Sequence, residues 1–163
     1  MPPANLRKQL EEASKKIFDE VDSAMQDLEN YPSPKASDSP QEIQNRILFL
    51  GGMDADLSYL YRQVLRVQQA VERHRSQARS NLEDKKMEEV HKTNLKLPNE
   101  YLSKTELELK LRARTIEEVY ESNGWETLHS DLRYLADTIR SYQFQIKRER
   151  SDIETRLRYF FEL

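Results

Sequence analysis

Apolar residues recur along much of this chain at alternating steps of three and four, a spacing that places them on one face of an α-helix. The clearest stripe lies in the last quarter, where the steps of 3, 4, 3, 4, 3 and 4 are those of a coiled-coil seam. A helix over 125–163 would be about 58 Å long, so it needs a partner from this chain or from another copy. We predict that the oligomer seam consists of Trp125, Leu128, Leu132, Leu135, Ile139, Tyr142 and Ile146.

The seam pattern changes after Ile146. Glu149 and Arg156 stand where the heptad repeat expects apolar residues. We therefore expect the helix to splay or to change partner beyond Ile146. The part before that point should pack against the third helix of the chain or against another protomer.

Three further helical segments precede the seam. The first covers about 5–30 and ends at a Pro/Ser-rich stretch, 31–40, which we expect to be a linker. The second opens at the pairing of Ser39 with Pro40, and Gly51 with Gly52 should break or kink it before the pattern resumes at Leu57.

The third helix has a capping-box signal from Ser103 to Glu106. Asn123 and Gly124 predict a stop or turn before the seam helix. No segment alternates with period two over a useful length. The predicted fold is therefore all-α, with long helices that form a helical hairpin or coiled-coil bundle and assemble as oligomers. Its parts are an amphipathic helix (1–30), a linker (31–40) and a bundle domain (41–163).

Composition agrees with long solvated helices and narrow apolar stripes. Charged residues make up 34% of the 163 positions, and the net charge of −3 gives no whole-chain attraction to nucleic acid. There is no Cys, which excludes disulfides and thiolate sites. Neither a signal-peptide pattern nor an apolar run of membrane-spanning length is present, so we expect an intracellular, cytoplasmic protein without a membrane partner.

The sequence offers no catalytic arrangement. The three histidines, His74, His91 and His129, are far apart and have no ligand-spaced neighbours, and His74 falls on an apolar stripe, where packing is its simplest role. Glycine-rich phosphate loops, nucleophile triads and zinc motifs are also missing. We therefore predict a protein that is not an enzyme and has no catalytic residues, no metal and no cofactor.

Two local concentrations of basic residues are candidates for binding nucleic acid. Five arginines against one acid lie between Arg62 and Arg79, and six basic residues against three acids lie between Arg140 and Arg158, interleaved with aromatic residues. Such residues can follow a phosphate backbone and stack bases, although the same charges also serve coiled-coil pairing. The candidate contacts are Arg62, Arg66, Arg73, Arg75, Arg79, Lys147, Arg148 and Arg150.

The stretch from Tyr101 to Glu106, a short break, and Trp125 in a Leu-rich helix with a basic-aromatic tail resemble the UvsY-like recombination mediator proteins of T-even-type phages. The resemblance covers about 57–163. It implies a homo-oligomer that binds single-stranded DNA and helps to load a recombinase onto DNA covered by a single-strand-binding protein, in the host cytoplasm. The family's paired tyrosines and glycine are missing around Arg79.

Two other functions stay open. The chain is alternatively a structural or scaffolding coiled-coil protein, such as a virion or assembly component, whose charges serve pairing and solubility. It is otherwise an adaptor that offers residues 5–30 to a groove on another protein. Arginines that form a continuous basic groove would favour the mediator, whereas arginines paired with carboxylates would favour the scaffold.

Overall fold

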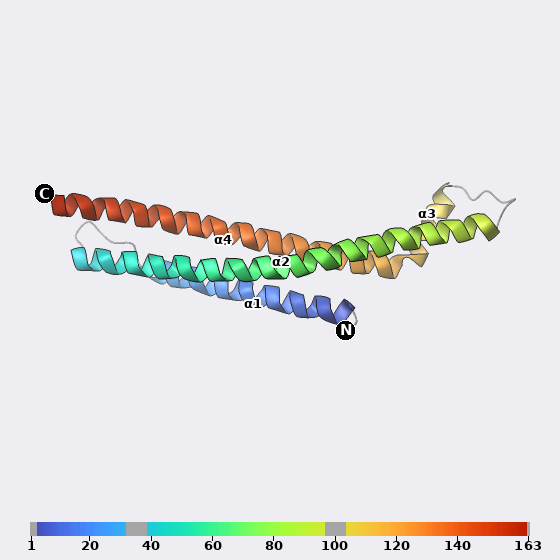
Figure 1. Cartoon of the computed structure of the whole chain (residues 1–163), viewed down its shortest axis with the longest axis horizontal. Helices are drawn as coiled ribbons and strands as arrows, with labels where there is room; N and C mark the ends of the chain where they lie inside the picture. Colours follow the sequence, from blue (N-terminus) through green and yellow to red (C-terminus); the bar gives the residue numbers. More distant parts are fainter. Residues whose placement is uncertain (1–2, 32–38, 97–103, 163) are drawn as a thin grey trace. The chain divides into compact units, whose positions relative to one another are not determined.

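A computed structural model describes residues 3–31, 39–96 and 104–162. These residues form four helices, α1 (Pro3–Asn30), α2 (Pro40–Lys96), α3 (Lys104–Arg114) and α4 (Ile116–Glu162), as Figure 1 shows. The all-α prediction is confirmed, and α2 packs against α4. The predicted capping box at Ser103 and most of the predicted linker lie outside the described residues.

The chain divides into two units, and the three long helices contribute to both. Unit 1 comprises Met1–Glu11 and Gln68–Asp131, and unit 2 comprises Glu12–Val67 and Leu132–Leu163. Each has its own core and its own polar contacts.

In unit 2, α2 and α4 run antiparallel. Later positions of α2 meet earlier positions of α4: Arg46 contacts Glu149, Asp54 accepts a hydrogen bond from Gln143, and Arg140 lies over the Tyr61 ring. Between these contacts lies a continuous apolar core to which α1 adds Ile17 and Val21. The buried residues of α2 and α4 follow the heptad spacing: Leu50, Met53, Leu57, Leu60, Val64, Leu132, Leu135, Ile139, Ile146 and Ile153.

The predicted splay or change of partner after Ile146 is wrong, because α2 supplies a polar residue that pairs with Glu149. Glu149 accepts two hydrogen bonds from Arg46, at 3.1 Å from Nε and 2.8 Å from Nη2. Arg46 is only 3% exposed, and its guanidinium lies over the stacked rings of Tyr31 and Phe49. Packing then resumes at the buried Ile153.

Unit 1 contains the start of the predicted seam. Trp125 and Leu128 are buried, together with Val71 and Ala78 of α2. His74 stacks on Trp125 with ring centroids 5.1 Å apart, so it is a packing residue. In both units the partner of the α4 stripe is α2. The expectation that the third helix pairs with this stripe is therefore wrong, because α2 presents an apolar stripe of the same period.

Neither glycine signal ends a helix. α2 continues through Gly51 and Gly52, and α4 continues through Asn123 and Gly124. A helical glycine costs about 1 kcal/mol relative to alanine, and burial of a neighbouring Leu or Trp contributes more than that. Leu50, Met53 and Trp125 flank these positions and are buried. Tertiary packing therefore overrides the local preference.

We expect Arg46→Leu to lower the free energy of unfolding by about 2–3 kcal/mol, because it removes charged hydrogen bonds at a buried position. Arg46→Lys should recover only part of the loss, since an ammonium lacks the forked geometry. Urea denaturation followed by circular dichroism measures both. If Arg46→Leu is as stable as the original chain, the pair with Glu149 does not stabilise the fold.

Candidate functional site

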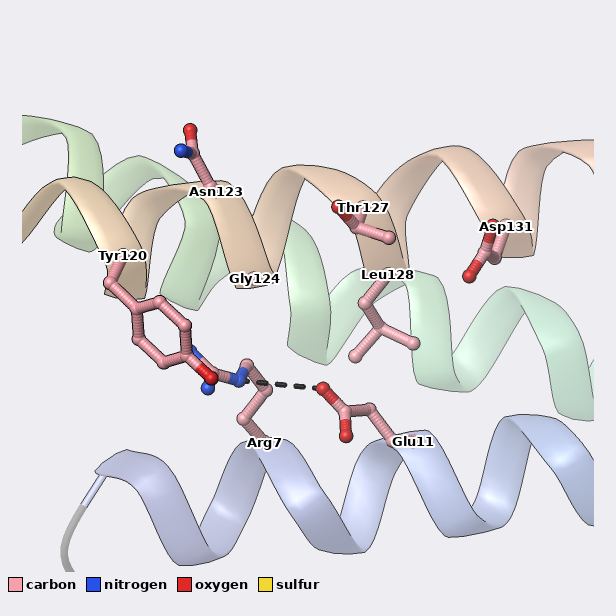
Figure 2. Close-up of a pocket in the computed structure, with 8 residues that line it drawn as sticks. All are labelled: Arg7, Glu11, Tyr120, Asn123, Gly124, Thr127, Leu128 and Asp131. Carbon is pink, nitrogen blue, oxygen red and sulfur yellow. Dashed lines mark ion pairs between the residues drawn. The ribbon is translucent and has the colours of Figure 1, made fainter.

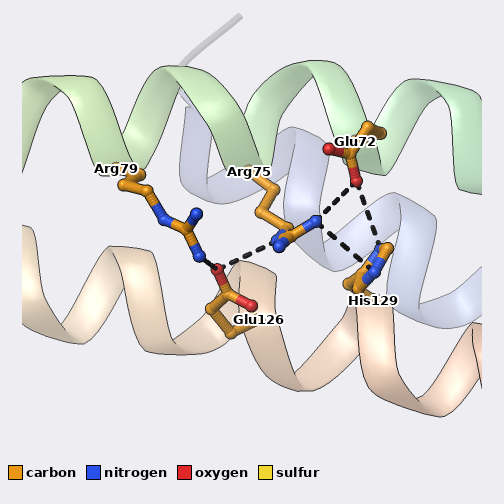
Figure 3. A network of polar contacts seen from close by, with 5 residues as sticks. All are labelled: Glu72, Arg75, Arg79, Glu126 and His129. Atoms are coloured by element: carbon orange, nitrogen blue, oxygen red, sulfur yellow. Dashed lines mark hydrogen bonds and ion pairs between the residues drawn. The ribbon is translucent and has the colours of Figure 1, made fainter.

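Two of the five arginines in the first candidate DNA-binding set, Arg75 and Arg79, are paired with carboxylates in unit 1. Arg75 donates to Glu126 at 2.9 Å through Nε and to Glu72 at 2.7 Å through Nη1, and Arg79 reaches the same Glu126 oxygen at 2.8 Å (Figure 3). Two guanidinium groups thus face two carboxylates, so these four side chains together have no net charge with which to attract phosphate. Arg73 is exposed.

His129 joins this cluster from α4. Its Nδ1 lies 3.5 Å from Glu72 Oε2, and its Nε2 lies 3.4 Å from Arg75 Nη1 (Figure 3). The hydrogen bond from Arg75 lowers the pKa of Glu126, and the bond to Glu126 raises the pKa of Arg75. Both groups stay charged at neutral pH, so the cluster is an interhelical electrostatic clamp.

The second candidate set lies in unit 2, where its members have different surroundings. Arg150 is paired with Glu154 one turn further along α4, at 3.1 Å. Lys147 and Arg148 are exposed and hold no ion pair with the residues that the structure describes. Phe144 is 68% exposed and precedes them by one helical turn. This group combines an accessible ring with two accessible cations.

Arg62 and Arg66 also lie in unit 2, exposed on the side of α2 that faces away from the core. Their spacing of four residues places them on one face of α2. The sequence analysis did not identify Leu48 and Tyr59, which lie on the same face and are 74% and 57% exposed. Their positions could have been found as a second heptad-spaced stripe, offset from the core stripe.

The predicted oligomer seam is buried inside a single chain. Six of its seven residues are at most 4% exposed, the exception being the half-buried Tyr142. The stripe therefore has its partner already, in α2. Association between copies remains a prediction, and without rearrangement it would require other surfaces.

Unit 1 also has an open pocket of about 380 Å³ between α1 and α4 (Figure 2). Arg7 crosses it, forms an ion pair with Glu121 at 2.7 Å and lies 5.6 Å from the Tyr120 ring centre. A Cβ at position 124 would collide with the Arg7 guanidinium, so Gly124 makes room for this contact. The pocket lining includes Glu11 and Asp131, and its polar groups form a helix-to-helix contact with no nucleophile and base in reach of each other.

Within the described ranges, no group of three or more His, Asp or Glu residues is placed to hold a metal ion. None of the helices there is long and apolar enough to cross a membrane. Comparison with protein-family models, with curated proteins and with solved structures found no match to this chain. The resemblance to recombination mediators therefore stays a hypothesis.

We expect Glu126→Gln to destabilise the chain by about 0.5–1 kcal/mol near neutral pH, since Glu126 is partly exposed and solvent screens its pairs. Its pKa is lower in the folded chain than the ordinary value of 4.5. The carboxylate's contribution is thus fully present above the unfolded pKa and is lost as the pH falls through the folded pKa.

Urea denaturation at about pH 7 and about pH 3.5 tests this expectation. The difference between Glu126→Gln and the original chain should shrink at the acid pH. Glu108→Gln, at an exposed position of α3, is the control. A difference for Glu126→Gln that is independent of pH would show that its charge does not stabilise unit 1.

Proposed function

We propose that this protein is a non-enzymatic, structural assembly component that works by packing helices against other protein surfaces. The observation that carries the proposal is the pairing of Arg75 and Arg79 with Glu72 and Glu126. Arg75 and Arg79, which the sequence suggests as phosphate contacts, instead hold α2 and α4 together in unit 1. This use of charge is typical of coiled-coil scaffolds.

The buried pair of Arg46 and Glu149 gives further support. A polar layer inside an apolar seam stabilises one alignment of two helices, because a slipped alignment would bury each charge against apolar side chains. An assembly component benefits from such a fixed alignment, since its outer surfaces must keep their spacing. Large apolar side chains on those outer surfaces, such as Leu48, offer contact area to partners.

The adaptor alternative receives less support. Its binding helix, α1, already buries Ile17 and Val21 within unit 2. To insert the same apolar side into another protein's groove, α1 would have to leave the core. A role that keeps α1 in place needs no such loss of buried surface.

The second candidate function is the single-stranded-DNA-binding recombination mediator, with a recombinase and a single-strand-binding protein as partners. It is favoured by Phe144, Lys147 and Arg148, which present a ring and two cations on one turn of α4. A ring can stack on a base while nearby cations contact phosphates. One such group is a small footprint, so tight binding would require several copies side by side.

Light scattering of the full chain, with and without an oligonucleotide, separates these functions. For the assembly component we expect a mass above the 19.4 kDa of one chain and no complex with a single-stranded oligonucleotide at about 150 mM salt. A complex that forms at low salt, weakens steeply with salt and is lost in Lys147→Glu with Arg148→Glu would favour the mediator. A monomer under every condition would contradict the assembly function.

A further inference from the structure

One face of α2 in unit 2 is exposed along five helical turns and has a defined pattern. We call it the α2 outer face. Its members recur at steps of 4, 3, 4, 3 and 4 on the side opposite to the core stripe, and each is exposed: Leu48, Gly52, Ala55, Tyr59, Arg62 and Arg66. It is thus a second heptad seam with no partner among the described residues, apolar at one end and basic at the other.

Gly52 leaves room for a close approach to this face. A Cβ at position 52 would meet nothing within 4 Å, and the backbone there has no positive φ. Alanine would therefore fit and would favour the helix by about 1 kcal/mol. The fold of a single chain gives no reason for glycine here, whereas a second helix packed on this face would gain room for a large side chain.

The apolar part of the α2 outer face is costly to leave in water. Leu48 and Tyr59 are 74% and 57% exposed, and the two small residues Gly52 and Ala55 lie between them on the same face. Arg62 and Arg66 follow at the basic end. A matching partner helix needs one bulky apolar residue opposite Gly52 and Ala55, followed within three turns by carboxylates.

The chain itself carries that pattern on α1. Phe18 is 51% exposed, and Asp22 and Glu29 follow it on the same side of the helix, at steps of 4 and 7. We call these three residues the α1 acidic side. Between residues 19 and 29 there are five exposed acids and no basic residue. This segment is therefore complementary in charge to the basic end of the α2 outer face.

We propose that a second copy of this chain docks its α1 acidic side onto the α2 outer face, and that the same contact repeats in reverse to close a dimer. This inference rests on the proposed assembly function and names its partner. In a parallel alignment that seats Phe18 beside Ala55, Asp22 lies level with Tyr59, one turn before Arg62. Glu29 then lies level with Arg66.

A two-fold axis across the helices is consistent with this alignment. In unit 2, α1 and α2 run in opposite directions (Figure 1). An α1 that is parallel to the partner's α2 therefore makes the two α2 helices antiparallel, as such an axis requires. Because each copy contributes both faces, the contact occurs twice, and in each the α1 acidic side lies along the part of the α2 outer face from Ala55 to Arg66.

Charge exchange between two variants tests the proposed contact. Variant A carries Arg62→Glu with Arg66→Glu, and variant B carries Asp22→Arg with Glu29→Arg. All four positions are exposed, so circular dichroism should show unchanged helix content. Alone, each variant should have the 19.4 kDa mass of one chain, because its contacts join like charges. An equimolar mixture should restore a dimer of A with B, in which both contacts join opposite charges.

Two further variants complete the test. Lys147→Glu with Arg148→Glu makes the same charge change as variant A away from the contact, and it should remain dimeric. Gly52→Gln should weaken the dimer at least about tenfold without loss of helix, because the side chain fills the space for Phe18. Ser141→Gln, on the exposed side of α4, is its control.

The outcomes separate the inference from the function on which it rests. If the original chain is oligomeric and neither A nor B alters its mass, the contact is wrong and the assembly function stands. If the original chain is a monomer, both are wrong. If A and B are monomers and their mixture remains so, charge pairing between the two faces is refuted.

Discussion

The packing of α2 along α4 is the constraint on which the rest of the structure depends. The two stripes have the same period and run antiparallel, so apolar side chains can meet in successive layers within each unit. Because one chain supplies both stripes, it needs no second copy to bury them. The surfaces left for function are therefore the outer faces of the helices, and their chemistry differs from that of the seam.

Polar contacts fix the alignment of this packing. In unit 2, Arg46 and Glu149 occupy seam positions and face each other, and the carbonyl of Tyr31 accepts a further bond from Arg46, which ties the end of α1 to the start of α2. In unit 1, Glu126 receives two guanidinium groups from α2. An isolated exposed pair would contribute little, but a desolvated or shared pair discriminates between alignments.

The sequence predicted the helices and the core stripe well, because both depend on local spacing. It failed at Gly51, Gly52 and Gly124, where packing outweighs local preference, and at Glu149, whose partner lies about a hundred positions away. The ion pairs of Arg75 and Arg79 could not be predicted for the same reason. Spacing placed Arg75 and Arg79 on α2, but only the antiparallel alignment brings Glu126 to them. The open space beside Gly52 could likewise not be predicted from the sequence, because it depends on which helices pack nearby.

Copies of this chain should meet through outer faces while the α2–α4 seam stays closed within each chain. The chain has no cysteine, so introduced thiols report single contacts. The most direct measurement is disulfide formation between two differently tagged copies, one carrying Phe18→Cys and the other carrying Ala55→Cys. Rapid cross-linking of the two tags is predicted. The opposite result would be cross-linking between copies that carry Leu57→Cys at the buried seam, with none between positions 18 and 55. That result would contradict association through the outer faces.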